Sequence, residues 1–189
     1  MLRPITHGLR GLSFLMALVV LALAANLIAI QVYGTPPVTT RYCTFTGGFG
    51  MIVAAVTTVC TIFLSSTVPE LVPIVLDGLA GLFFLGGGIA WAYSLKDTAN
   101  CSNYDQMLLN PLLNQGSLTV GDRTAYGVVG SDDDVETVMN RLKGNCQRAQ
   151  ADEVIQFICF GIGIALVAIG LVQMRRGLGG GARRTGAYV

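Results

Sequence analysis

The sequence predicts an all-α membrane protein in which four transmembrane helices form a bundle. Of the 189 residues, 52% are hydrophobic and only 12% are charged, whereas soluble domains carry about 25% charged residues. Four long segments carry almost no charge, and the charged residues gather at the two ends of the chain and in one loop. The net charge of +1 gives no basic surface for nucleic acid, so we expect no nucleic-acid partner.

The first span is predicted at residues 11–33, after a short basic N-terminus at residues 1–10. The span contains no charged residue and is long enough to cross a bilayer. A basic start and an apolar run also fit a cleaved signal peptide. The run is longer than a typical signal core and its cleavage motif is weak, so we favour a retained span. Gly34-Thr35-Pro36-Pro37 predicts the turn that follows.

The second span is predicted at residues 42–67, again without charge. Thr46, Gly50, Ala54 and Thr58 recur every four residues, which places small side chains on one helix face. Such a ladder lets a neighbouring helix approach closely, although it could also arise by chance in a segment rich in Gly and Ala. The connection to the next span is very short, which predicts antiparallel neighbours.

The third span is predicted at residues 71–95 and contains one carboxylate, Asp77. On a helix, Asp77, Gly81, Gly88 and Ala92 fall on one face because they are separated by four, seven and four positions. A carboxylate at membrane depth is costly and should face protein or water. We therefore predict that this span is the inner helix of the bundle.

Asp77 is the sharpest candidate site. It should lie about two turns inside the membrane, near the level of Arg10 and Arg175, either of which could reach it. The alternatives are hydrogen bonds from Thr61, Ser65 or Gln173. We favour a structural anchor inside the bundle; the functional alternative is a proton or lipid-headgroup site.

The fourth span is predicted at residues 154–174, with Gly161 and Ala165 at a spacing of four. Basic residues flank the first and last spans at the chain ends, which predicts that both termini are cytoplasmic. The loop at residues 96–153 then lies outside. The tail, residues 175–189, is rich in glycine and could contact anionic lipid or simply hold the topology; its basic residues are Arg175, Arg176, Arg183 and Arg184.

The outer loop carries Cys101 just after the third span and Cys146 just before the fourth. In an oxidising compartment a disulfide between them would close the loop at its base; two free thiols are the alternative. Cys43, Cys60 and Cys159 lie in or next to the spans and are most simply packing residues. A short helix is predicted at residues 135–143.

Catalytic motifs are mostly absent from the sequence. One histidine rules out a two-histidine metal site within one chain. No CxxC pair, Walker loop or GxSxG elbow occurs. The acidic stretch around Asp133 lacks calcium-loop spacing and is better explained as a solvated turn. We expect no enzymatic activity, no cofactor and no metal.

The ordered set of local motifs resembles the MARVEL-domain fold, and more closely its fungal non-classical-export family. The motifs cover nearly the whole chain: Arg41-Tyr42-Cys43-Thr44-Phe45, Leu76-Asp77-Gly78-Leu79, Cys101-Ser102-Asn103-Tyr104, Cys146-Gln147-Arg148-Ala149-Gln150-Ala151 and Arg183-Arg184-Thr185-Gly186. The chain departs from that pattern by a longer outer loop, with an insertion around residues 118–136.

The resemblance implies a non-enzymatic organiser of plasma-membrane domains in fungal membrane patches. Such proteins are associated with eisosome-type, sterol-rich patches that respond to sphingolipid, and with a cytoplasmic coat. The implied partners are sphingolipid, sterol, anionic phospholipid, further copies of the chain or other membrane proteins. Two other classes stay open: an accessory subunit of a larger membrane enzyme or transporter, and a small transporter or channel that uses Asp77.

Overall fold

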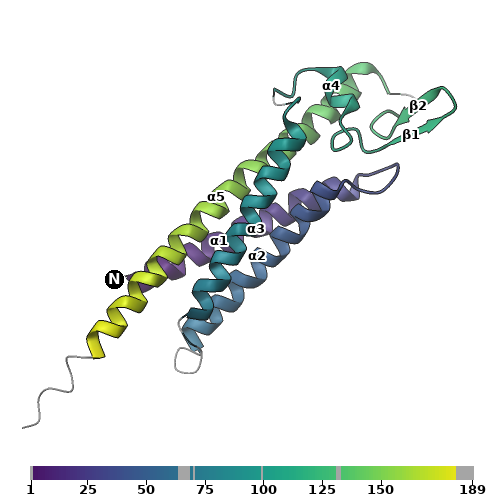
Figure 1. The fold of residues 1–189 in the computed structure, drawn as a ribbon. Helices are drawn as coiled ribbons and strands as arrows, with labels where there is room; N and C mark the ends of the chain where they lie inside the picture. The colour runs from purple at the N-terminus through teal and green to yellow at the C-terminus, as the bar shows by residue number, and fades with distance from the viewer. Residues whose placement is uncertain (1, 64–68, 70, 99, 131–132, 182–189) are drawn as a thin grey trace, which may run out of the picture.

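The protein is a four-helix bundle with a folded cap at one end (Figure 1). The structure, a computed structural model, describes residues 2–63, 69, 71–98, 100–130 and 133–181, and the side chains of residues 4–175 within these ranges. Four helices are long and apolar enough to cross a membrane. They are α1 (Leu2–Ala29), α2 (Val38–Phe63), α3 (Leu71–Leu95) and α5 (Val135–Gly181).

The starts of the first two predicted spans shift for local reasons. Helix α1 begins at Leu2, nine residues before the predicted start, because Pro4 lies in the first turn, where a helix tolerates proline. Helix α2 begins at Val38, directly after Pro37, and the Arg41 amide donates to the Pro37 carbonyl at 3.2 Å. The predicted end of this span, residues 64–67, lies outside the described residues. Helix α3 has the predicted bounds.

Helix α5 differs most from the sequence-based prediction. Residues 135–153 were expected to be loop with one short helix, but they continue into the fourth span as a single helix of 47 residues. Asp134 starts this helix, since its Oδ1 accepts a hydrogen bond from the Thr137 amide at 3.0 Å. No proline interrupts the segment. At 1.5 Å per residue the helix is about 70 Å long, whereas the other three spans have 28, 26 and 25 residues.

The cap comprises α4 (Tyr104–Leu109), β1 (Ser117–Val120), β2 (Arg123–Tyr126) and the first part of α5, residues 135–153. The two strands form an antiparallel hairpin in which Ser117 pairs with Tyr126 and Val120 with Arg123. The hairpin is an addition to the expected all-α architecture. We call the capped end of the bundle the cap end and the opposite end, where α1 begins and α5 finishes, the tail end (Figure 1).

The helices form a ring of two tight pairs. Helix α1 packs chiefly against α2, and α3 chiefly against α5, with thinner contacts between α2 and α3 and between α1 and α5. The hydrophobic core of the cap continues into the cap end of the bundle, where Trp91 and Leu95 of α3 join Leu113, Val128 and Leu142. Cap and bundle therefore share one core.

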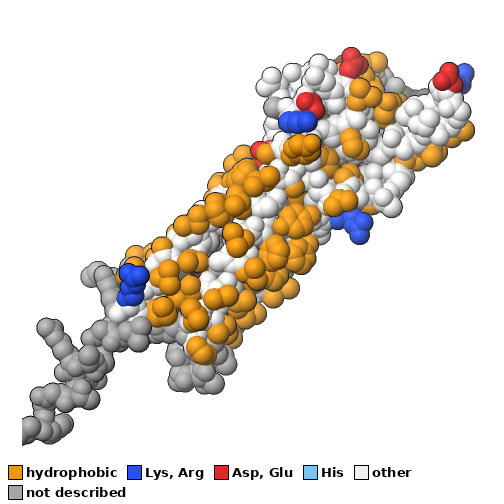
Figure 2. All heavy atoms as spheres, viewed as in Figure 1, with side chains coloured by type: hydrophobic (Ala, Val, Ile, Leu, Met, Phe, Trp, Pro, Cys, Tyr) orange, Lys and Arg blue, Asp and Glu red, His pale blue; other side chains and the backbone are white. Residues whose placement is uncertain are grey.

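The outside of the bundle is apolar (Figure 2). Orange side chains cover the helices along their length in this view, while the cap is mostly white with scattered charge. Exposed apolar side chains occur on every span, among them Leu15, Leu18, Ile52, Val56, Val75, Leu82, Ile89 and Ile164. This distribution is the inverse of that in a soluble bundle, and lipid tails are the medium that suits it.

Candidate functional site: two buried polar networks in the bundle

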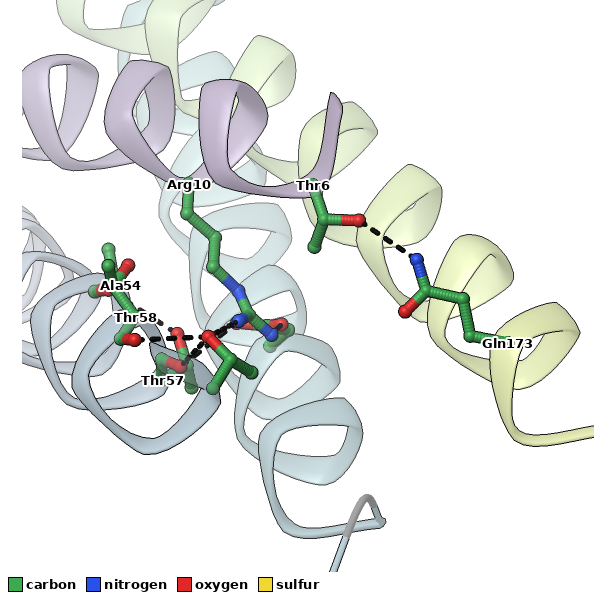
Figure 3. Close-up of polar contacts among 8 residues, drawn as sticks. Thr6, Arg10, Ala54, Thr57, Thr58 and Gln173 are labelled. Carbon is green, nitrogen blue, oxygen red and sulfur yellow. Dashed lines mark hydrogen bonds and ion pairs between the residues drawn. The ribbon is translucent and has the colours of Figure 1, made fainter. Parts of the chain in front are cut away.

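The first network joins α1, α2 and α3 around Arg10. Its Nη2 donates to Asp77 Oδ2 at 2.8 Å, and both side chains are 4% exposed. Its Nη1 donates to the Thr57 carbonyl at 3.0 Å and to Thr61 Oγ1 at 2.9 Å. Figure 3 shows Arg10 reaching from α1 towards Thr57. A single guanidinium thus connects three helices, and a buried charge is tolerated there because it is paired. We call these four residues the Arg10 network.

Of the partners considered for Asp77, the structure places only Arg10 against it among the described residues. Thr61 contacts Arg10 instead. Gln173 lies farther along α5, where its Nε2 donates to Thr6 Oγ1 at 3.3 Å (Figure 3). Arg175 is exposed. Ser65 lies outside the described residues.

A cavity of about 10 Å³ lies against the pair and is lined by Arg10, Asp77, Gly50, Phe84 and Gly163, among others. This volume is close to the minimum that holds one water molecule. The cavity has no room for an organic substrate or for an ion with its hydration shell. In this conformation the Arg10 network ties helices together and does not line a passage.

The second network lies nearer the cap end and centres on Asp152 of α5. Its Oδ2 accepts from Trp91 Nε1 at 3.1 Å, and its Oδ1 accepts from Gln156 Nε2 at 3.4 Å. Thr46 Oγ1 of α2 donates to Gln156 Oε1 at 3.3 Å. All four side chains are at most 1% exposed. We call these residues the Asp152 network; it joins α2, α3 and α5.

From the sequence, Asp152 was expected in the outer loop at residues 96–153, so this network was not predicted. A signal was present: Asp152, Gln156, Cys159 and Gly163 are separated by four, three and four positions, a single helix face that continues into the apolar span. All four are buried. Because the fourth span was predicted to begin at residue 154, directly after the last charged residue, Asp152 was left outside the helix face to which it belongs.

The predicted small-residue ladder on α2 faces the bundle interior. Thr46, Gly50 and Ala54 are buried and Thr58 is half-buried. Gly50 makes room for the ring of Phe84, which a Cβ at this position would overlap. The closest helix approach is at Gly47, where a Cβ would lie 2.6 Å from the Leu21 backbone nitrogen of α1. The α1–α2 contact therefore depends on a glycine next to the ladder.

The α3–α5 contact is made by glycines on both helices. A Cβ on Gly163 would lie 3.0 Å from the Gly81 Cα, so backbone packs on backbone here. Gly88, also predicted as a packing residue, faces the ring of Phe157. Ala92, which was placed on the same face, is exposed. The predicted pair on α5 is shifted: Gly161 has nothing within 4 Å of a built Cβ and is exposed, and Gly163 makes the contact instead.

The structure joins Cys101 and Cys146 by a disulfide with Cα atoms 5.8 Å apart. Both side chains are buried in the shared core. Cys43, Cys60 and Cys159 are free, and Cys43 and Cys159 are buried.

The acidic stretch of the cap contacts the first turns of α5. Arg141 forms an ion pair with Asp133. The pKa of Asp134 is lowered because the Thr137 side chain and amide donate to its carboxylate. The acidic stretch thus caps and braces α5.

Of the four arginines predicted to contact lipid or coat, only Arg175 has a described side chain. Arg175 is exposed, the side chain of Arg176 is not described, and Arg183 and Arg184 lie outside the described residues. Among the described residues, no cluster of three or more His, Cys, Asp or Glu side chains is arranged to hold a metal ion.

A protein family matches most of the chain. No curated protein and no solved structure matches the chain. The family described as a membrane-associating domain matches residues 3–169, a range that takes in nearly all of the first span, the second and third spans, the cap and most of the fourth span. With four apolar helices and this match over most of its length, the chain belongs to the MARVEL family of membrane-associating proteins.

Proposed function

We propose that this chain is a non-enzymatic organiser of plasma-membrane domains, found in eisosome-type, sterol-rich patches that respond to sphingolipid levels. The membrane-associating family and the four apolar helices support a role within membranes. The cytoplasmic orientation of both termini, the sterol and sphingolipid partners, and the cytoplasmic coat are the specific parts that need testing.

The observation that carries the proposal is that the buried polar groups of the bundle bind one another and are not accessible to a substrate. Asp77 and Asp152, the two buried carboxylates of the described bundle, are bonded to side chains of neighbouring helices. The cavity at the Arg10 network is too small for a substrate. Chemistry or transport inside one chain would need such groups to be accessible. The large apolar exterior is the surface left for function, and it suits lipids and lateral association.

The first experiment is imaging of the tagged protein in its native plasma membrane before and after acute inhibition of sphingolipid synthesis. We expect stable patches that disperse within the time over which sphingolipid falls. A tagged single-span protein in the same cells controls for general loss of membrane order. A uniform distribution that inhibition leaves unchanged would contradict the proposal.

Lateral assembly is the physical step that the proposal requires. Reconstitution of the purified chain into defined bilayers, with and without sphingolipid and sterol, tests it directly. We expect the fraction of oligomer, measured by energy transfer between labelled copies, to rise when these lipids are included. An oligomer fraction that does not depend on lipid composition would remove the coupling between lipid and assembly.

An accessory-subunit role is the second candidate, and the cap favours it. Leu109, Leu118, Val120 and Val129 expose 68%, 49%, 70% and 43% of their surface around the cap, which suits contact with another protein. Copurification with one partner at fixed stoichiometry is the expected result for this role. A transporter role instead predicts solute flux in liposomes that Asp77→Asn abolishes while the protein stays folded.

A further inference from the structure

A second cavity lies at the cap end, outside both polar networks. It is a cleft of about 510 Å³, within the range of roughly 300–1,000 Å³ that is usual for ligand pockets. Its walls come from the start of α2 and the residue before it, from the end of α3 and the residues after it, and from α4 with the residues that follow; they include Thr39, Tyr93, Ser94, Lys96, Asp97 and Leu109.

The depth of the cleft follows from the end of α3. Lys96 is the first residue after this span, so the cleft lies where hydrocarbon gives way to lipid headgroups. Tyr93, one turn below, is 71% exposed on the outside of the bundle, a position that tyrosine commonly takes at a membrane interface. Leu109 on the cap side is 68% exposed. The mouth of the cleft is therefore apolar on both sides.

One positive and one negative residue line the cleft, Lys96 and Asp97. The Lys96 Nζ lies over the Tyr93 ring, 4.8 Å from its centroid, a cation–π contact that holds the ammonium at the rim. Asp97 follows directly and is exposed. Neither residue takes part in the two ion pairs found within the described ranges.

Two hydrogen bonds fix the walls of the cleft, whose lining is otherwise largely apolar. Thr39 Oγ1 and Ser94 Oγ are 3.1 Å apart and share a hydrogen bond between α2 and α3. Asn110 Nδ2 donates to the Ser94 carbonyl at 2.9 Å, which ties the cap to the end of α3. The shape of the cleft is thus set by contacts among three parts of the chain, and its two charged groups are left for a ligand.

We propose that this cleft binds the headgroup of a zwitterionic phospholipid, with Lys96 on the phosphate and Asp97 on the cationic amine. Charge complementarity selects this class. An anionic lipid would pair with Lys96 but bring negative charge to Asp97, and a sterol or diacylglycerol would leave both charges without partners. The apolar mouth formed by Tyr93 and Leu109 favours a ligand that carries acyl chains. The inference deepens the proposed function, since it names a lipid class and its binding site.

The test uses the full-length chain purified in a mild detergent and native mass spectrometry with added lipid. Phosphatidylcholine, phosphatidylglycerol and diacylglycerol with identical acyl chains are compared. We expect phosphatidylcholine to be retained most, and Lys96→Gln to weaken its binding by about fivefold, the factor that one interfacial cation is worth. Lys143→Gln is the matched control, because Lys143 is exposed on the cap and does not line the cleft.

The Asp97→Asn variant tests the headgroup preference of the cleft. Removing the carboxylate removes both the attraction for the amine and the repulsion of an anionic headgroup, so we expect the preference to move from phosphatidylcholine towards phosphatidylglycerol. A competition arm with soluble glycerophosphocholine separates a membrane lipid from a free headgroup; we expect little displacement of bound lipid. Equal retention of the three lipids, unchanged binding in Lys96→Gln, an unchanged preference in Asp97→Asn or displacement by the soluble compound would each overturn the inference.

This outcome is separable from that of the proposed function. Lipid retention is measured on the purified chain, whereas patch formation is measured in cells. Selective binding together with a uniform cellular distribution would keep the cleft and remove the domain-organising role. Dispersing patches together with unselective binding would do the reverse.

Discussion

Arg10 and Asp77 form the most consequential pair of side chains, because each is buried and each would be costly alone. Breaking a buried ion pair by removing one partner commonly costs about 3–5 kcal/mol, whereas replacing both partners by apolar groups of similar size is often neutral. Asp77 was identified from the sequence because it is the only acidic residue in its span. Arg10 was one of two arginines at a suitable level, and only the packing of α1 decides between them.

At this pair we predict strong coupling in unfolding measurements. Arg10→Met and Asp77→Leu should each lower the free energy of unfolding by about 3 kcal/mol, since each leaves a buried group without its partner. The double variant should lose clearly less than the sum. Unfolding in detergent micelles, followed by the fluorescence of the single buried Trp91, measures all three. Additive losses would show that the two side chains do not depend on each other.

The Asp152 network gives a second prediction at the residue scale. Asp152→Asn keeps an acceptor for Trp91 Nε1 but removes the charge, while Asp152→Leu removes the acceptor and leaves the indole N–H buried without a partner. An unsatisfied buried group costs about 1–3 kcal/mol. We therefore expect Asp152→Leu to be less stable than Asp152→Asn by about that amount. Equal stability of the two variants would mean that the indole hydrogen bond contributes nothing.

At the scale of elements, each of the two tight helix pairs depends on a close approach at glycine, Gly47 for α1–α2 and Gly163 for α3–α5. Gly163 meets the backbone of α3, whereas Gly161, two positions earlier on the same helix, faces outwards. Sequence spacing selected Gly161 with Ala165 because they are four positions apart, and it gave no reason to prefer Gly163. What separates them is the rotation of α5, which Asp152 and Gln156 set by turning inwards.

This difference gives a prediction with its own control. Gly163→Leu should prevent the close approach of α3 and α5 and lower the melting temperature or the yield of folded protein markedly. Gly161→Leu should leave stability unchanged or raise it slightly, since leucine is the better helix former by up to about 1 kcal/mol and faces lipid here. Size-exclusion chromatography after heating compares both variants. Equal losses in the two would place the α3–α5 contact elsewhere.

The strands of the cap could have been foreseen in part. Gly121-Asp122 separates two short runs rich in Leu, Thr, Val and Tyr, and a two-residue Gly-Asp loop is typical of a hairpin; Gly121 has φ +63°. The cap fold as a whole could not be read from the sequence. It depends on long-range contacts, such as the amides of Val32 and Tyr33 donating to the Gln115 carbonyl at 2.9 and 3.2 Å, that no local pattern announces.

At the scale of the whole molecule, the disulfide joins Cys101, six residues after the end of α3, to Cys146 in the cap portion of α5. The 45-residue separation gives a loop-closure contribution of about 4 kcal/mol in the chain-entropy model. The spans hold their own glycine contacts and polar networks, so the bundle should persist without the bond. The number and rough position of the spans followed from the four long uncharged runs in the sequence, because the bilayer requires long apolar helices.

We predict that the variant with both Cys101→Ser and Cys146→Ser keeps the bundle and loosens the cap. Hydrogen exchange of the full chain in detergent should speed up across residues 104–150 and stay unchanged in α2 and α3. Cys60→Ser is the matched control, because Cys60 is free and only half-buried. Faster exchange throughout the spans would show that the bundle relies on the cap for its stability.

The length of α5 has a mechanical consequence. The same helix forms one wall of the cap and one of the four spans, and it is continuous from Val135 to Gly181. A helix resists bending and twisting far more than a loop does, so it acts as a lever that passes through the membrane. Any lipid or protein that tilts the cap also tilts the far end of this lever on the other side of the bilayer.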